Sequence, residues 1–329
     1  MGDVRRRVAI AAGFLISAVA VALVVRTIDV EQALVIIRTA NPLPLLGVAG
    51  VVCLGIAMKA LRWSILLAAP DREGIPARRL APPLFIGYLG NAVLPARLGE
   101  AMRAVLVQRR EGIGIAESVG VVLLERLIDV ATLALVALVA ANVIAAPVWA
   151  VQVLLVVTVV SGGGLVLLTA IGVRPVLRIA DRLGLRGRPR LRAVATDFAK
   201  ALGGSSRRRA IVVAVAVSLV AWLVDGMSFW LAGIALGVHI DYPAALVVSG
   251  FAVLGTAIPS APGYVGTFEL AAAAMATAIG VSGASALALA IVAHVMVLAT
   301  VTVGGLVSLL SMSVGMSELR RRASQLSGR

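Results

Sequence analysis

The sequence predicts an all-α polytopic membrane protein, with about six spanning helices and two oppositely inserted re-entrant helical hairpins in an inverted repeat. The composition, the length of the apolar runs and the placement of the arginines lead to this fold class. Of 329 residues, 60% are hydrophobic and 14% charged, whereas soluble domains have about 45–50% apolar and about 25% charged residues. This composition excludes secreted, fibrous, disordered and ordinary cytosolic proteins, and we treat residues 1–329 as a single membrane domain.

Six apolar runs are long enough to cross a membrane, which takes about 20 residues. They are 8–25, 44–66, 117–141, 147–171, 210–238 and 284–313. The first run contains Ala18-Val19-Ala20, a pattern that also occurs where signal peptides are cleaved. Because the run continues unbroken to Val25, we interpret it as an uncleaved first helix. All six runs are continuous rather than alternating, which excludes a β-barrel.

The arginines indicate the orientation. Segment 172–209 carries ten arginines and one lysine against two aspartates, and loops of this charge stay in the cytoplasm. Arg5–Arg7 and Arg320–Arg322 then place both termini on the same side. The predicted location is the bacterial cytoplasmic membrane. The net charge of +14 is read as a topology signal, and no nucleic-acid partner is expected. The apolar face formed by Leu191, Val194, Phe198 and Leu202 either lies on anionic lipid or only accompanies the orientation signal.

Two further apolar stretches are interrupted, and the parity of crossings assigns them to hairpins. If 80–108 crossed the membrane once, the basic segment 172–209 would fall outside; a hairpin that enters and leaves by the cytoplasmic side keeps every basic segment inside. By the same count, 242–281 begins and ends outside. It is either two complete spans or a second hairpin, and the prolines and glycines in its middle favour the hairpin.

These assignments divide the chain into two repeats of opposite topology, 8–141 and 147–313. Each consists of two spans, one hairpin and one more span. The hairpin tips are also alike in sequence, since Pro95 and Gly99 in the first correspond to Pro259 and Gly266 in the second. Interrupted segments at matching positions in two inverted halves indicate the substrate site of a transporter. Alternatively, the prolines and glycines only fit neighbouring helices together.

Charged residues and one asparagine gather where a lipid environment would be costly. The first hairpin contains one group and the span 117–141 another. They are Asn91, Arg97, Glu100 and Arg103 in the hairpin, and Glu125, Arg126 and Asp129 in the span. Each charge costs about 2.5–3.5 kcal/mol at the centre of a lipid-facing helix, so the groups must face each other or a wet cavity. The spacing pairs Glu100 with Arg103 and Arg126 with Asp129. Glu125 and Asp129 need a cation between them, for which Arg97 and Arg103 are the candidates.

Both a closed ion-pair network and a substrate cavity fit this pattern. At the second tip, Pro262 and Gly263 allow a turn at membrane depth, and the half-helix after Gly266 presents a positive end that suits an anionic head group. Glu269 in that half-helix has either a capping role or a substrate role. Two residues deep in spans, Asp225 and His294, are candidates for proton coupling, although a structural histidine is equally compatible. Lys59 and Arg62 are read as snorkelling at the interface.

The sequence contains no signature of a nucleotide, metal or covalent site. Cys53 is the single cysteine, so neither a disulfide nor a cysteine-based metal site forms within the chain. We therefore expect no cofactor and no bound metal.

The polar motifs together resemble one family. They are Arg62-Trp63, the N-x-x-x-P-x-R-x-G-E-x-x-R pattern of 91–103, the E-R-x-x-D pattern of 125–129 and the P-x-x-P-G-x-x-G-x-x-E pattern of 259–269. The chain resembles the flippase-like membrane domain of bacterial lysylphosphatidylglycerol synthases, which also occurs alone. Those synthases carry a soluble aminoacyl-transferase domain after the membrane part. The chain reaches Arg329 without one, so we expect no synthase activity and no enzyme.

The resemblance implies that the chain moves an anionic phospholipid, an aminoacyl-phospholipid or a polyprenyl-phosphate-linked sugar between leaflets. It also implies that the matching charged residues line a cavity, with Arg97 and Arg103 on phosphate. The expected partners are membrane lipids with anionic head groups and an enzyme of envelope-glycolipid synthesis, and a homo-oligomer is compatible with the sequence. A proton-coupled transporter of a small solute and a lipid-presenting partner of such an enzyme remain alternatives.

Overall fold

The computed structural model describes residues 2–68, 74–94, 98–171 and 208–327, together with five single positions between 172 and 207. Within these residues the chain is helical and contains no strand. The helices are α1 (Gly2–Thr27), α2 (Val30–Arg38), α3 (Pro42–Leu67), α4 (Ala77–Val93), α5 (Leu98–Glu111), α6 (Ile115–Val143), α7 (Val148–Ile171), α10 (Arg208–Leu236), α11 (Tyr242–Gly255), the 3₁₀ turn η4 (Pro262–Tyr264), α12 (Thr267–Ala278) and α13 (Gly283–Ser327).

The described helices support four or five membrane spans rather than a firm six. Four are long and apolar enough by themselves, namely Pro42–Leu67, Val148–Ala170, Arg208–Leu236 and Gly283–Met312. A fifth candidate consists of α1 and α2, which are bent by 89° at a short break. The predicted span 117–141 is present as α6, which is 29 residues long but is not among these candidates. The chain is thus a multi-pass membrane protein, and the count of six spans stays a prediction.

Helix α2 has no counterpart in the predicted spans. Its start is fixed by Asp29, whose side chain accepts a hydrogen bond from the backbone N–H of Gln32 at 2.9 Å. Asn41 caps α3 in the same way through the N–H of Leu43. A capping side chain satisfies one of the backbone donors that a helix start leaves free. These two caps explain why the chain turns sharply between the first two long helices.

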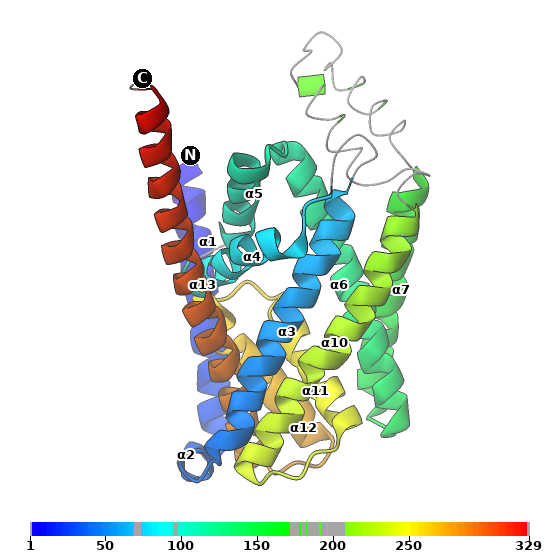
Figure 1. Ribbon diagram of the computed structural model, residues 1–329. Coiled ribbons are helices and arrows are strands. Elements are labelled where there is room, and N and C mark those ends of the chain that lie inside the picture. Colours follow the sequence, from blue (N-terminus) through cyan, green and yellow to red (C-terminus); the bar gives the residue numbers. More distant parts are fainter. Residues whose placement is uncertain are drawn as a thin grey trace.

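Both predicted hairpins exist as pairs of helices, α4 with α5 and α11 with α12. Figure 1 shows them at opposite ends of the bundle, with the long helices α3 and α10 running past both. The marked chain ends lie at the end that holds α4 and α5, and so do the ends of α7 and α10 that flank segment 172–207. Which of these ends faces the cytoplasm remains a prediction.

Glycines bring the two helices of the first hairpin into direct contact. A side chain at Gly99 would collide with the carbonyl oxygen of Gly87 and with Asn91, and one at Gly90 would meet Gly99. The Asn91 side chain accepts a hydrogen bond from the N–H of Gly99 at 3.0 Å. Gly99 therefore lies in the first turn of α5 at its closest contact with α4, and this close approach brings the charged face of α5 towards α6.

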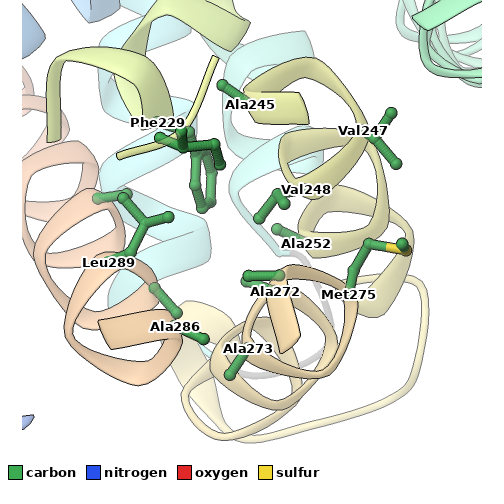
Figure 2. Packing of buried hydrophobic residues seen from close by; sticks show 14 of the residues in the cluster. Phe229, Ala245, Val247, Val248, Ala252, Ala272, Ala273, Met275, Ala286 and Leu289 are labelled. Atoms are coloured by element: carbon green, nitrogen blue, oxygen red, sulfur yellow. The ribbon is translucent and has the colours of Figure 1, made fainter. Parts of the chain in front are cut away.

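The second hairpin packs through alanines instead. Ala245 and Ala252 of α11 and Ala272 and Ala273 of α12 are fully or almost fully buried, and Figure 2 shows them together with Phe229 of α10 and residues of α13. Small side chains let membrane helices approach closely and gain dispersion contacts. This half of the molecule therefore has an apolar, tightly packed core.

The two hairpin tips meet inside the bundle. A side chain at Gly263 would approach the carbonyl oxygen of Ala92 at 3.3 Å, so η4 lies against the end of α4. Ser17 of α1 supports the second tip by accepting a hydrogen bond from the N–H of Ala261 at 2.8 Å. Tips that meet from opposite ends are compatible with an inverted repeat of 8–141 and 147–313. The repeat itself and the two-sided insertion stay predictions.

Candidate functional site

Arg62 of α3 is the centre of a buried ion-pair network, although its side chain is only 1% exposed. It donates to Glu125 of α6 at 2.8 Å and forms an ion pair with Asp129, to which a second hydrogen bond runs at 3.1 Å. It also donates to the hydroxyl of Ser218 in α10 at 2.8 Å. Arg62 therefore ties three long helices together.

Arg103 of the first hairpin closes the same network from the other side. Its guanidinium donates to the second carboxylate oxygen of Glu125 at 2.5 Å and lies 4.9 Å from the ring centroid of Trp63. Such a cation–π contact adds to the ion pair in a desolvated place. Arg103 is 3% exposed, so the network anchors α5 to α3 and α6.

Arg126 differs from Arg62 and Arg103 because its contacts to carboxylates are longer and its side chain is more exposed. It lies 3.5 Å from Glu100 and 3.9 Å from Asp129, and its side chain is 35% exposed. These separations are at or beyond the limit of a good hydrogen bond, and Arg126 makes no side-chain hydrogen bond to a described residue. Its donors are consequently available to another acceptor.

A second ion pair joins α3 and α10. Lys59 pairs with Asp225, and the ammonium group lies 4.8 Å from the ring centroid of Trp222. The absence of a side chain at Gly55 makes room for the Asp225 carboxylate. Both charges are thus partly neutralised before any ligand enters.

The two ion-pair systems border a cavity of about 230 Å³ between the hairpins. Its charged and ionisable lining consists of Lys59, Glu100, Arg126, Asp129, Asp225 and His294. The remaining lining is mostly apolar or aromatic, with hydroxyl groups from both halves of the chain. A largely apolar pocket with a few convergent polar groups is the usual form of a ligand site.

Glu269 holds the second hairpin tip rather than lining this cavity. One carboxylate oxygen accepts a hydrogen bond from the N–H of Gly266 at 2.7 Å, and the other lies 2.6 Å from Nδ1 of His294. The His294 ring stacks on Phe268 with centroids 4.1 Å apart. The positive end of α12 therefore already receives a carboxylate of the chain itself at Gly266, where the sequence suggested a ligand.

The structure brings most of the predicted site residues together. Asn91, Glu100, Arg126, Asp129, Asp225 and His294 line the main cavity, and Arg103 lines a small adjoining hollow with Asn91 and Glu100. Glu125 is buried behind them at 1% exposure. Pro95 and Arg97 lie outside the described residues, so the expected role of Arg97 on phosphate stays a prediction.

Two expectations about pairing are wrong. Glu100 is paired with Arg126 rather than with Arg103, and Arg62 is the cation between Glu125 and Asp129. The position of Arg62 near the end of an apolar run predicts a side chain that snorkels to the membrane interface, and this prediction is also wrong. Arg62 is buried, since α3 continues to Leu67 and the side chain faces α6 rather than the membrane interface.

The tip residues of the second hairpin adopt the turn that their types predict. Gly263 and Gly266 have φ values of +72° and +92°, which side chains other than glycine rarely adopt. Pro262 begins the short turn η4, and Pro259 lies in the connection before it. Gly263 also lines the cavity, so the turn itself forms part of the site.

Comparison with known proteins identifies the family. The sequence profile described as the lysylphosphatidylglycerol synthase TM region matches residues 10–305. The chain belongs to this family. It is also 30% identical to the glycosyltransferase AglD of Haloferax volcanii, over 99% of this chain but 58% of that protein. The chain thus spans somewhat over half the length of this curated relative, which is archaeal.

These relationships support a function connected with membrane lipids or glycolipids. They also overturn one expectation, that the chain is not an enzyme. The similarity to a protein named as a glycosyltransferase extends over nearly the whole chain, and the absence of familiar catalytic motifs was not sufficient ground for that expectation.

Proposed function

We propose that the chain binds the phosphate-bearing head group of a membrane lipid or a lipid-linked sugar in the cavity between the hairpins. We further propose that it moves this head group between leaflets while the lipid tails stay in the bilayer. The movement would serve a glycosyl-transfer reaction. The membrane-region family and the glycosyltransferase relative support the lipid and sugar parts of this proposal.

Arg126 is the observation that carries the proposal. A guanidinium group suits phosphate because its donors form a planar fork, and Arg126 reaches the cavity with only long contacts to Glu100 and Asp129. Arg62 and Arg103 already form short ion pairs with the buried carboxylate of Glu125, and Arg62 also pairs with Asp129. Among the described arginines of the site, Arg126 is therefore the one that can receive a phosphate without breaking the network.

Leaflet exchange in reconstituted liposomes tests this proposal. A fluorescent polyprenyl monophosphate in the inner leaflet becomes accessible to an impermeant quencher only after it moves outwards. We expect the wild type to accelerate this exchange and Arg126→Gln to slow it by about 10–100-fold, as for the loss of a charge-assisted hydrogen bond.

Arg79→Gln is the matched control. Arg79 is 57% exposed, and its Nε lies 3.2 Å from a carboxylate oxygen of Glu111. Neither residue lines the cavity. This variant should exchange the probe as fast as the wild type. A wild-type rate equal to that of protein-free liposomes would refute translocation, and equal rates for wild type and Arg126→Gln would refute the role of Arg126.

A further inference from the structure

The cavity is also lined by neutral polar groups that have no hydrogen-bond partner among the described residues. Ser228 of α10 and Ser249 of α11 both line the cavity and are 5% and 6% exposed. Neither hydroxyl makes a side-chain hydrogen bond among the described residues. Trp222 lines the same cavity and is 8% exposed, and its buried indole N–H has no hydrogen-bond partner in the described part of the chain.

Five other hydroxyl side chains of the helices behave differently, although the buried hydroxyl of Ser118 in α6 also has no partner among the described residues. Thr132, Thr158, Ser161, Thr169 and Thr300 each donate to the backbone carbonyl four residues earlier, at 2.6, 2.7, 2.5, 2.9 and 2.7 Å. This local bond is the ordinary way for a hydroxyl on a helix to be satisfied without water. Ser228 and Ser249 do not use it, so their hydroxyl groups are available to a molecule in the cavity that they line.

The first hairpin adds a donor at the other side of the cavity. The Asn91 side chain uses its oxygen to accept from Gly99, which leaves its amide N–H groups without a partner among the described residues. Asn91 lines the cavity together with the ring of Tyr88. Neutral donors and hydroxyls therefore come from α4, α10 and α11, alongside aromatic rings.

We infer that these groups form a subsite for a neutral, hydroxyl-rich group, that is, for the sugar of a lipid-linked sugar. The inference rests on the proposed function and names its head-group class. Sugar hydroxyls both donate and accept, so they match serine hydroxyls, an indole N–H and an amide better than an ammonium group does. An ammonium group only donates hydrogen bonds, so it cannot pair with the amide N–H groups or the indole N–H, which are donors as well.

Binding measurements in nanodiscs separate this subsite from the phosphate site. The probes are a short-chain polyprenyl monophosphate, the same lipid carrying one hexose on its phosphate, and a phospholipid with a primary amine in its head group. We expect wild type to bind the hexosyl lipid about tenfold more tightly than the monophosphate. We expect the double variant Ser228→Ala, Ser249→Ala to lose that preference, since two neutral hydrogen bonds account for about tenfold in affinity.

The control is Ser161→Ala, which removes a hydroxyl that is bonded to Val157 within α7 and lies outside the cavity. It should leave the preference unchanged. Arg126→Gln should weaken the binding of the polyprenyl monophosphate and of its hexosyl derivative alike. This pattern would support the subsite and the phosphate site together.

Three results would overturn the sugar subsite. The first is that wild type binds the hexosyl lipid and the monophosphate with equal affinity. The second is that the double serine variant loses affinity for these two probes equally. The third is that the double serine variant loses affinity for the amine-bearing probe alone. In each case a persisting effect of Arg126→Gln would leave the proposed function standing. If the wild type bound neither the polyprenyl monophosphate nor its hexosyl derivative, the proposed function would be refuted.

Discussion

Arginines of the same cluster are held in two different ways. Arg62 and Arg103 are almost fully buried and donate short hydrogen bonds to Glu125, whereas Arg126 is partly exposed and has only long contacts. The first arrangement leaves little charge for a ligand, and the second leaves most of it. The comparison teaches that a charged motif in a membrane helix divides into a structural part and a ligand-facing part, which sequence spacing does not separate.

The largest effect is expected for Arg62→Met. Among the described residues, this change leaves Glu125, Asp129 and Glu100 paired with two arginines, Arg103 and Arg126, so one carboxylate of the network loses its partner. Removing one member of a buried ion pair costs about 3–5 kcal/mol. Thermal melting in detergent, together with the folded fraction on size exclusion, should show a strongly destabilised protein.

Arg79→Met is the control for that prediction. Arg79 is 57% exposed in its pair with Glu111, so its loss should cost less than the loss of the buried Arg62. If both variants melted alike, Arg62 would not be the structural centre of the network, and the division of the cluster would lose its first half.

A smaller effect is expected for Gly99→Ala, which tests how α5 presents Arg103 to α6. The new methyl group would collide with the backbone of α4 at Gly87, and overpacking of this kind costs about 1–3 kcal/mol. Gly50→Ala serves as the control, since nothing lies within 4 Å of a side chain there. Melting temperatures that fall equally for both would contradict the close packing of the first hairpin.

Glu269→Ala extends the comparison to the second hairpin. The change removes the bond to Gly266 and the contact with His294, and loss of a helix cap costs about 1 kcal/mol. Melting measurements should place it between Gly99→Ala and the control Glu31→Ala, which alters an exposed residue in the first turn of α2. A melting temperature equal to that of Glu31→Ala would show that Glu269 does not hold the tip.

The smallest effect on stability is expected for Arg126→Gln. Its contacts are long and partly exposed, so the change should cost less than about 1 kcal/mol. The same variant should show the largest loss of phosphate-lipid binding. A melting temperature as low as that of Arg62→Met would place Arg126 in the structural part and remove the distinction between the two kinds of arginine.

Sequence reasoning predicted the helical class, the interrupted stretches and the charged clusters because each depends on local patterns. Apolar run length determines a span, and the glycines at 99, 263 and 266 signal close packing or turns within a few residues. The number of membrane spans was harder to predict, because α2 and the bend before it depend on Asp29 and Asn41 as helix caps. A search for apolar runs does not detect such caps.

The partners within the cluster were not predictable in the same way. Arg62 binds Glu125 and Asp129, which are 63 and 67 positions further along the chain, and Ser218 lies still further away in α10. Nothing in the local sequence of these residues indicates which arginine faces which carboxylate. The nearest available signal was that Lys59 and Arg62 lie within a helix that continues to Leu67.

The most direct test of the central claim is a structure of the protein in nanodiscs with polyprenyl monophosphate bound. The account predicts that the phosphate lies within hydrogen-bond distance of the Arg126 guanidinium, inside the cavity bordered by Asn91 and Gly263, while Arg62 keeps its contacts to Glu125 and Asp129. A phosphate bound only outside this cavity, or bound to Arg62 with the network broken, would contradict it.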